Sequence, residues 1–202
     1  MSSSPPLTGR LRPRNRVAIL DAARRLVDDK GEAFTTQDLI KEAGVALQTF
    51  YRHFEGKDQL LLAVIGDLTA QHCEDLEERA AGLARPDDRL RFYIVETLDS
   101  LVASPGSSAS RFVTSQHWRL YQSHPDEVVA ANQPFADLVR RELEAGQAAG
   151  VFTPRDPETD AWLITKLVMA VFHHYSFLPE DGASRSIVDA TLEFCLAAVR
   201  AK

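Results

Sequence analysis

Hydrophobic residues recur every three to four positions along almost the whole chain, and no stretch alternates in the manner of a half-buried strand. In the first such run, Val17, Leu20 and Val27 fall on one face of a helix expected over residues 14–30, which Gly31 ends. Further helices are expected over residues 37–43, 46–54, 57–81, 86–103, 109–123, 125–149, 157–178 and 184–201. The pattern therefore predicts an all-α fold.

The second expected helix has a strongly marked start. Thr35 and Asp38 have the spacing of a capping box, and Phe34 and Leu39 occupy the positions of a hydrophobic staple. Gly44 separates this short helix from the next one, so the two have the dimensions of a helix-turn-helix. An ordinary helical hairpin at the start of a bundle is the alternative.

The second helix of this pair has an unusual outer face. Once its apolar residues turn inward, six side chains remain outside: Leu47, Gln48, Thr49, Tyr51, Arg52 and His53. A solvated helix more often exposes Glu and Lys, whereas an amide suits an adenine edge and Tyr, Arg and His donate to phosphates. These residue types favour contact with DNA.

The charge of the chain is unevenly distributed. The 202 residues are 45% hydrophobic and 26% charged, as in an ordinary globular protein, and the formal net charge of −6 argues against a uniformly basic protein. Residues 1–60 hold ten Lys and Arg against eight Asp and Glu, a net charge of +2, which leaves −8 for residues 61–202. The basic excess is concentrated in four arginines: Arg10, Arg12, Arg14 and Arg16. Such an arm either follows the phosphates of DNA or makes the chain more soluble.

Nothing in the sequence points to secretion or to a membrane. Residues 1–9 are rich in Ser and Pro and lack the apolar core of a signal peptide, so we expect a disordered tail. The longest apolar run, Leu167–Phe172, is far too short to span a bilayer. Cys73 and Cys195 lie in apolar helical patterns, which favours buried free thiols over a disulfide. We therefore expect a soluble, cytoplasmic protein with no membrane partner.

Residues 14–66 resemble the DNA-binding domain of the TetR family of bacterial transcriptional repressors. The resemblance rests on the leading helix ILDAARRLV, the AGV turn, the FYRHF segment and the lysine that opens the next helix. It implies a helix-turn-helix DNA-binding domain over residues 10–56, or to about residue 74 if the start of the fourth helix is included. Residues 57–202 would then form an effector-binding and dimerisation domain.

The resemblance also implies roles for individual residues in DNA binding. Those implied to reach base edges are Leu47, Gln48 and Thr49. Those implied to hold phosphates are Thr36 or Gln37, Tyr51, His53 and Lys57, while Arg52 suits either role and Arg14 belongs to the basic arm. Ala46 departs from the family, which usually has Ser or Thr there to cap the recognition helix.

For the C-terminal two-thirds the resemblance is mainly architectural and implies a helical bundle that binds a ligand and dimerises. The residues expected to line a pocket for a small, largely hydrophobic effector are Phe92, Tyr93, Glu96, His117, Trp118, Tyr121 and His173. The helix over residues 157–178 is apolar nearly all round and the last helix carries an apolar stripe, so one face of each would meet a second copy. The residues expected at that dimer interface are Trp162, Lys166, Met169, His173, Val188, Leu192, Cys195 and Val199.

The sequence thus predicts a homodimeric repressor that a small-molecule effector releases from a double-stranded DNA operator. No phosphate loop, nucleophile motif or HExxH segment occurs, so we expect no catalysis and no cofactor. His173 and His174 point about 100° apart on a helix and do not suit one metal ion. The alternatives are a helical enzyme or lipid-carrier domain with an incidental helix-turn-helix, and an activator that uses the same DNA contacts.

Overall fold

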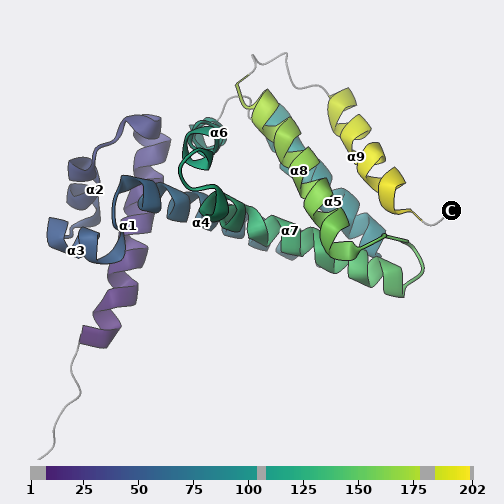
Figure 1. The fold of residues 1–202 in the computed structure, drawn as a ribbon, viewed down its shortest axis with the longest axis horizontal. Coiled ribbons are helices and arrows are strands. Elements are labelled where there is room, and N and C mark those ends of the chain that lie inside the picture. The colour runs from purple at the N-terminus through teal and green to yellow at the C-terminus, as the bar shows by residue number, and fades with distance from the viewer. Residues whose placement is uncertain (1–7, 104–107, 178–184, 201–202) are drawn as a thin grey trace, which may run out of the picture. The chain divides into compact units, whose positions relative to one another are not determined.

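The computed structural model describes residues 8–103, 108–177 and 185–200, and within these ranges the chain folds into nine α-helices (Figure 1). They are α1 (Thr8–Lys30), α2 (Thr36–Ala43), α3 (Leu47–His53), α4 (Lys57–Ala80), α5 (Pro86–Ala103), α6 (Ser108–Tyr121), α7 (Pro125–Ala148), α8 (Pro157–Tyr175) and α9 (Arg185–Val199). None of these helices is both long and apolar enough to cross a membrane. The prediction of an all-α fold is confirmed.

The first helix begins earlier than predicted. α1 starts at Thr8, so Thr8 and Gly9 are helical although we expected them in a disordered tail; residues 1–7 of that tail lie outside the described residues. The sequence pattern predicts a start at about Arg14, directly after Pro13. α1 instead continues through Pro13.

The chain divides into two compact units, Met1–Ile65 and Gly66–Lys202, and the division falls within α4. In the N-terminal unit, α1 packs against α2 and α3, and its core includes the fully buried side chains of Ile19, Leu39 and Phe50. These three residues come from three different helices, so the short α2 and α3 are held by α1 rather than by their own length.

In the C-terminal unit, α5 packs against α7, α8 and α9, and α7 packs against α8 (Figure 1). The buried residues Leu90, Ile94, Leu138, Val168 and Leu192 bring these helices into one hydrophobic core. As predicted, both cysteines are free and buried in this core.

The connection between α7 and α8 is tied closely to the rest of the C-terminal unit. Gly150 adopts a φ of 69°, in the left-handed region, and the backbone N–H of Val151 returns to the carbonyl of Gly146 at 2.8 Å. The backbone N–H of Thr153 donates to the carbonyl of Val199 at the end of α9, at 2.7 Å. Between these bonds the fully buried ring of Phe152 lies directly over Gly146.

We expect Gly146→Ala to destabilise the C-terminal unit by about 1–3 kcal/mol, because the added methyl group would overlap with the buried Phe152 ring. Thermal or urea unfolding measures the loss. Gly82→Ala is the matched control, since a methyl group there meets no atom within 4 Å. Equal stability of the two variants would show that Phe152 moves aside at no cost.

Candidate nucleic-acid interface and ligand cavity

The helix-turn-helix is held together on its inner side by aromatic packing. Phe50 and Phe54 are 1% and 3% exposed, with ring centroids 5.8 Å apart. Gly44 has a φ of 63° and donates its backbone N–H to the last carbonyls of α2, which turns the chain sharply between α2 and α3. The inner side of α3 is therefore fixed, and this also fixes how the helix is rotated about its own axis.

The outer side of α3 is accessible. Leu47 and Tyr51 are 48% and 56% exposed, Gln48 and Arg52 are exposed, and Thr49 is half-buried. No residue of α3 is acidic. The surface thus combines apolar, amide, phenol and guanidinium groups without a carboxylate. This composition suits contact with the base edges and the phosphate backbone of DNA.

His53 is placed differently from the other five predicted residues. It is half-buried, and its Nε2 atom is buried without a hydrogen-bond partner in the described residues. This nitrogen faces the protein interior, so any contact with a phosphate in this conformation would need the other ring nitrogen.

The predicted capping box at the start of α2 is confirmed. The Thr35 side chain accepts a hydrogen bond from the Asp38 backbone N–H at 3.1 Å, and the Thr35 backbone N–H donates to the Asp38 carboxylate at 2.8 Å. Lys30 Nζ donates to the same carboxylate at 3.0 Å. The hydrogen bonds from Thr35, and then that from Lys30, hold the pKa of Asp38 well below its ordinary value. The start of α2 is thereby fixed, with Thr36 half-buried and Gln37 exposed beside it.

Lys57 lies at the start of α4 and makes a contact that the sequence did not reveal. Its Nζ atom donates to the carbonyl oxygen of Phe34 at 2.7 Å and lies 4.8 Å from the centroid of the Phe34 ring. Lys57 therefore joins the start of α4 to the segment before α2. Of the predicted basic arm, Arg14 and Arg16 are exposed on α1, and the Arg16 guanidinium lies 5.8 Å from the centroid of the Phe54 ring.

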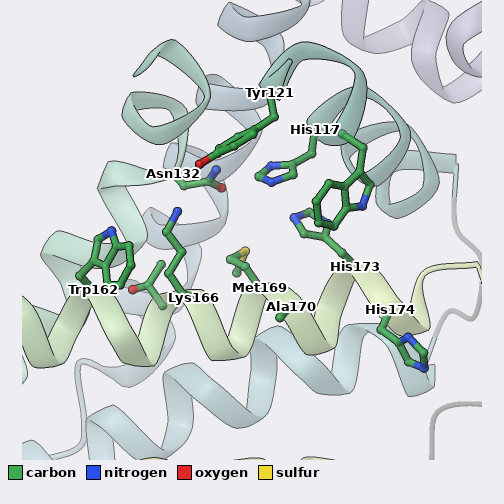
Figure 2. A pocket seen from close by; sticks show the side chains of 11 residues that line it. His117, Tyr121, Asn132, Trp162, Lys166, Met169, Ala170, His173 and His174 are labelled. Carbon is green, nitrogen blue, oxygen red and sulfur yellow. The ribbon is translucent and has the colours of Figure 1, made fainter. Parts of the chain in front are cut away.

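A cavity of about 630 Å³ in the C-terminal unit lies between α6, the first half of α7 and α8 (Figure 2). Its walls include four residues predicted for a ligand pocket: His117, Trp118, Tyr121 and His173. Four residues predicted for the dimer interface line it: Trp162, Lys166, Met169 and again His173. Sequence reasoning missed Asn132, which is 8% exposed, and Thr165, which is 4% exposed.

A smaller apolar hollow of about 210 Å³ lies next to this cavity. Asn132 and Met169 belong to the walls of both, and the remaining lining of the hollow includes Leu68, Phe135 and Phe172. His72 and Thr97 supply a polar pair there, with 3.0 Å between Nε2 and Oγ1.

The structure does not bring the other three predicted pocket residues to either cavity. Tyr93 is buried and its hydroxyl donates to Glu142 at 3.4 Å. Glu96 forms an ion pair with Arg79, whose guanidinium lies 5.2 Å from the centroid of the Phe92 ring. Tyr93, Glu96 and Phe92 therefore stabilise α5 against its neighbours.

His173 is the most strongly perturbed titratable group of the cavity. It is 6% exposed, its Nδ1 lies 2.9 Å from Thr114 Oγ1, and its ring centroid lies 4.4 Å from that of His117. Burial, then the neighbouring His117, then the charge of Lys166 lower the pKa of His173 to about 3. Burial followed by Lys166 also lowers the pKa of His117. The imidazole of His173 is therefore neutral at neutral pH.

The α9 residues predicted for the dimer interface lie instead in the core of the protomer. Their exposed fractions are at most 3%: Val188, Leu192, Cys195 and Val199. An apolar stripe seen in sequence can face either the core or a partner, and here it faces α5 and α8. Two exposed apolar side chains, Leu163 of α8 and Phe194 of α9, at 51% and 69%, line a groove of about 280 Å³ between the two helices.

Comparison with known proteins identifies relatives of the N-terminal segment and of the fold. Residues 19–64 match the family model described as "Bacterial regulatory proteins, tetR family". The HTH-type transcriptional regulator BetI of Rhizobium meliloti (strain 1021) is 32% identical over 85 residues, a match that covers 42% of this chain and 42% of BetI. The chain thus matches less than half the length of this curated relative.

Solved structures share the fold across nearly the whole chain. FadR of Thermus thermophilus, described as a TetR-family repressor in complex with lauroyl-CoA, superposes with a TM-score of 0.71 at 18% identity, over 93% of this chain and 96% of FadR. RolR in complex with resorcinol gives a TM-score of 0.69 at 18% identity, over 92% of this chain and 89% of RolR. At this identity the likeness shows the common fold.

We expect the C-terminal unit to lose stability as the pH falls below about 6.5, because His173 takes up a proton when unfolded but not when folded. One such group changes the free energy of unfolding by about 1.4 kcal/mol per pH unit, or about 2 kcal/mol at pH 5. Unfolding of the wild type and of His173→Gln between pH 7 and pH 5 measures the difference. The variant should depend less on pH, whereas His174→Gln, at an exposed neighbouring position, should keep the wild-type slope.

Proposed function

The chain belongs to the tetR family by its N-terminal domain, and we propose that it is a DNA-binding transcriptional regulator, most simply a repressor that a small molecule releases from its operator. The observation that carries the proposal is the acid-free outer face of α3, held at a fixed rotation by Phe50 and Phe54 within the segment that matches the family. A DNA-binding protein of bacterial type acts in the cytoplasm, which is where we expect this one.

The accessible side chains of α3 suit two different tasks on DNA. We propose that Gln48 and Thr49, with Leu47 at the start of the helix, reach base edges in the major groove, since amide and methyl groups distinguish base pairs there. Tyr51 and Arg52 would hold phosphates, together with Gln37 or Thr36 at the start of α2. These assignments are supported by exposure and by residue type.

Lys57 has a structural task in addition to the one that the resemblance implies. Its bond to the Phe34 carbonyl keeps the start of α4 next to the start of α2. We therefore propose that it positions the phosphate-binding residues of α2, and that Arg14, exposed on α1, contributes charge to the same surface.

The effector would occupy the cavity between α6, α7 and α8. RolR and FadR are described in complex with resorcinol and lauroyl-CoA, which shows that proteins of this fold take very different ligands. α4 begins in the N-terminal unit and ends in the C-terminal unit, so a ligand that shifts α4 would alter the presentation of α3. A hundredfold preference of the ligand for the state that does not bind DNA corresponds to about 2.7 kcal/mol, enough to empty an operator near its dissociation constant.

We propose further that the protein acts as a homodimer. Leu163 and Phe194 are large apolar side chains that are about half or more exposed, and they flank one groove. Two copies related by a twofold axis would bury Leu163 and Phe194 of each protomer. They would also present two α3 helices to half-sites about 34–36 Å apart on DNA.

We expect Gln48→Ala to relax the preference at one base pair of the selected sequence by about 1–3 kcal/mol, because the loss of one amide removes one direct contact. Tyr51→Phe should instead weaken all sequences alike. Selection from a randomised duplex library, followed by sequencing, gives the preference of each variant.

Gln147→Ala is the matched control for Gln48→Ala, since Gln147 is exposed on α7 in the C-terminal unit. The control should select the wild-type sequence. A wild-type protein that selects no sequence above background would contradict the proposed function.

We expect Phe194→Asp to give a monomer, because a carboxylate at a position that is 69% exposed is well solvated in the protomer but not in an interface. Sedimentation or light scattering measures the mass. Val17→Asp, at an exposed apolar position on α1, should leave the mass unchanged. A wild-type monomer at micromolar concentration would refute the dimer.

A further inference from the structure

The cavity between α6, α7 and α8 is positively charged. Lys166 is the one Lys, Arg, Asp or Glu among its lining residues, so no carboxylate faces the Lys166 ammonium there. The ammonium lies 5.5 Å from the centroid of the Trp162 ring, and within the described residues it has neither a hydrogen bond nor an ion pair. The charge of Lys166 also lowers the pKa of both His117 and His173, whereas no carboxylate acts on either ring. A cation is therefore disfavoured in this cavity and an anion is favoured.

Two buried polar atoms in the cavity wall lack a partner. His173 is 6% exposed and its Nε2 has no hydrogen bond among the residues described here; Thr165 is 4% exposed and the same holds for its Oγ1. An unsatisfied buried polar atom costs free energy, so such atoms are rare unless a ligand or water completes them. Thr165, Lys166 and His173 lie on α8, and Figure 2 shows Lys166 and His173 on the side of α8 that faces α6.

The opposite wall offers flat aromatic surfaces. The ring of His117 stacks on that of Tyr121 with centroids 5.8 Å apart and planes inclined by 24°. Trp118 on the same wall is 61% exposed, and Trp162, across the cavity on α8, is 49% exposed, far more than is usual for tryptophan in a core. A planar ring that slides between these side chains would gain both apolar burial and stacking.

We propose that this cavity binds an aromatic carboxylate, with the carboxylate at Lys166 and Thr165 and the ring against His117, Tyr121 and Trp118. The inference rests on the proposed ligand-responsive function and names the chemical class of the effector. The neutral His173 completes the site, because its free nitrogen can meet a polar substituent on the ring. The adjoining apolar hollow beyond Met169 leaves room for a hydrophobic substituent.

The chain contains only two tryptophans, and both line the cavity, so tryptophan fluorescence reports on this site directly. We would titrate the full chain with four compounds of matched shape: 4-tert-butylbenzoate, the corresponding benzamide, 4-tert-butylcyclohexanecarboxylate and the 4-tert-butylbenzyltrimethylammonium ion. We expect the benzoate to bind at least tenfold more tightly than the amide and about threefold to tenfold more tightly than the cyclohexane acid. The ammonium ion should bind most weakly.

Variants of the cavity residues test whether Lys166 and Thr165 cause the preference for the benzoate over the benzamide. Lys166→Met keeps the length of the side chain and should make benzoate and amide bind alike, and Thr165→Val should weaken the benzoate alone by several-fold. Arg155→Met removes a positive charge from an exposed position outside the cavity and should retain the preference. Circular dichroism confirms that each variant is folded.

The proposal is overturned if benzoate and amide bind alike, if Lys166→Met keeps the preference, if the ammonium ion binds best, or if no compound binds. It is also overturned if acrylamide cannot quench the tryptophans of the free protein, since a second copy would then cover the cavity. DNA selection by the same preparation distinguishes the cases: sequence-specific binding with no ligand response refutes this inference alone, and the absence of specific binding refutes the proposed function.

Discussion

The set of α3 side chains that the N-terminal unit presents to solvent depends on the burial of the other side of that helix. A helix of seven residues has too few backbone hydrogen bonds to persist alone, so its stability comes from what it packs against. Phe50 and Phe54 supply that packing, and burying one such side chain contributes about 1.5–3 kcal/mol. Because the two rings fix the rotation of the helix, they also decide which side chains are left to solvent. The hydrophobic core therefore determines where Gln48 is presented to a DNA partner.

Local sequence signals were sufficient to predict most of this unit. The capping box at Thr35, the glycine turn and the inward aromatics each leave a mark within a few residues, so the two short helices were found at nearly the right bounds. Contacts between distant residues leave no such mark. The bond from Lys57 to the Phe34 carbonyl joins positions 23 residues apart, and the inward Nε2 of His53 depends on a rotamer. Neither could be read from spacing.

In the C-terminal unit the sequence revealed the faces of the helices but not their neighbours. The sequence predicts Trp162, Lys166 and Met169 at a dimer interface, and in the structure all three line one cavity of the protomer. The sequence also predicts that the apolar stripe of α9 through Leu192 meets a partner, whereas in the structure the stripe lies in the protomer core. Periodicity shows that a face is apolar, whereas the identity of what covers it depends on the packing of four or five helices at once. Phe92 shows the same limit of the sequence pattern: it was expected to line a ligand pocket, but its ring lies beside the Arg79 guanidinium.

The two cysteines have a practical consequence for observing the protein at work. Both thiols are buried, and burial raises the pKa of Cys73 to about 12 and that of Cys195 to about 11, so almost no thiolate is present at neutral pH. Maleimide dyes and spin labels react with thiolates, and the natural protein should therefore stay unlabelled. A single cysteine introduced on an exposed position of α1 would become the one reactive site, with no need to replace a core residue first. Distances between two such labels could then follow the separation of the DNA-reading helices as a ligand is added.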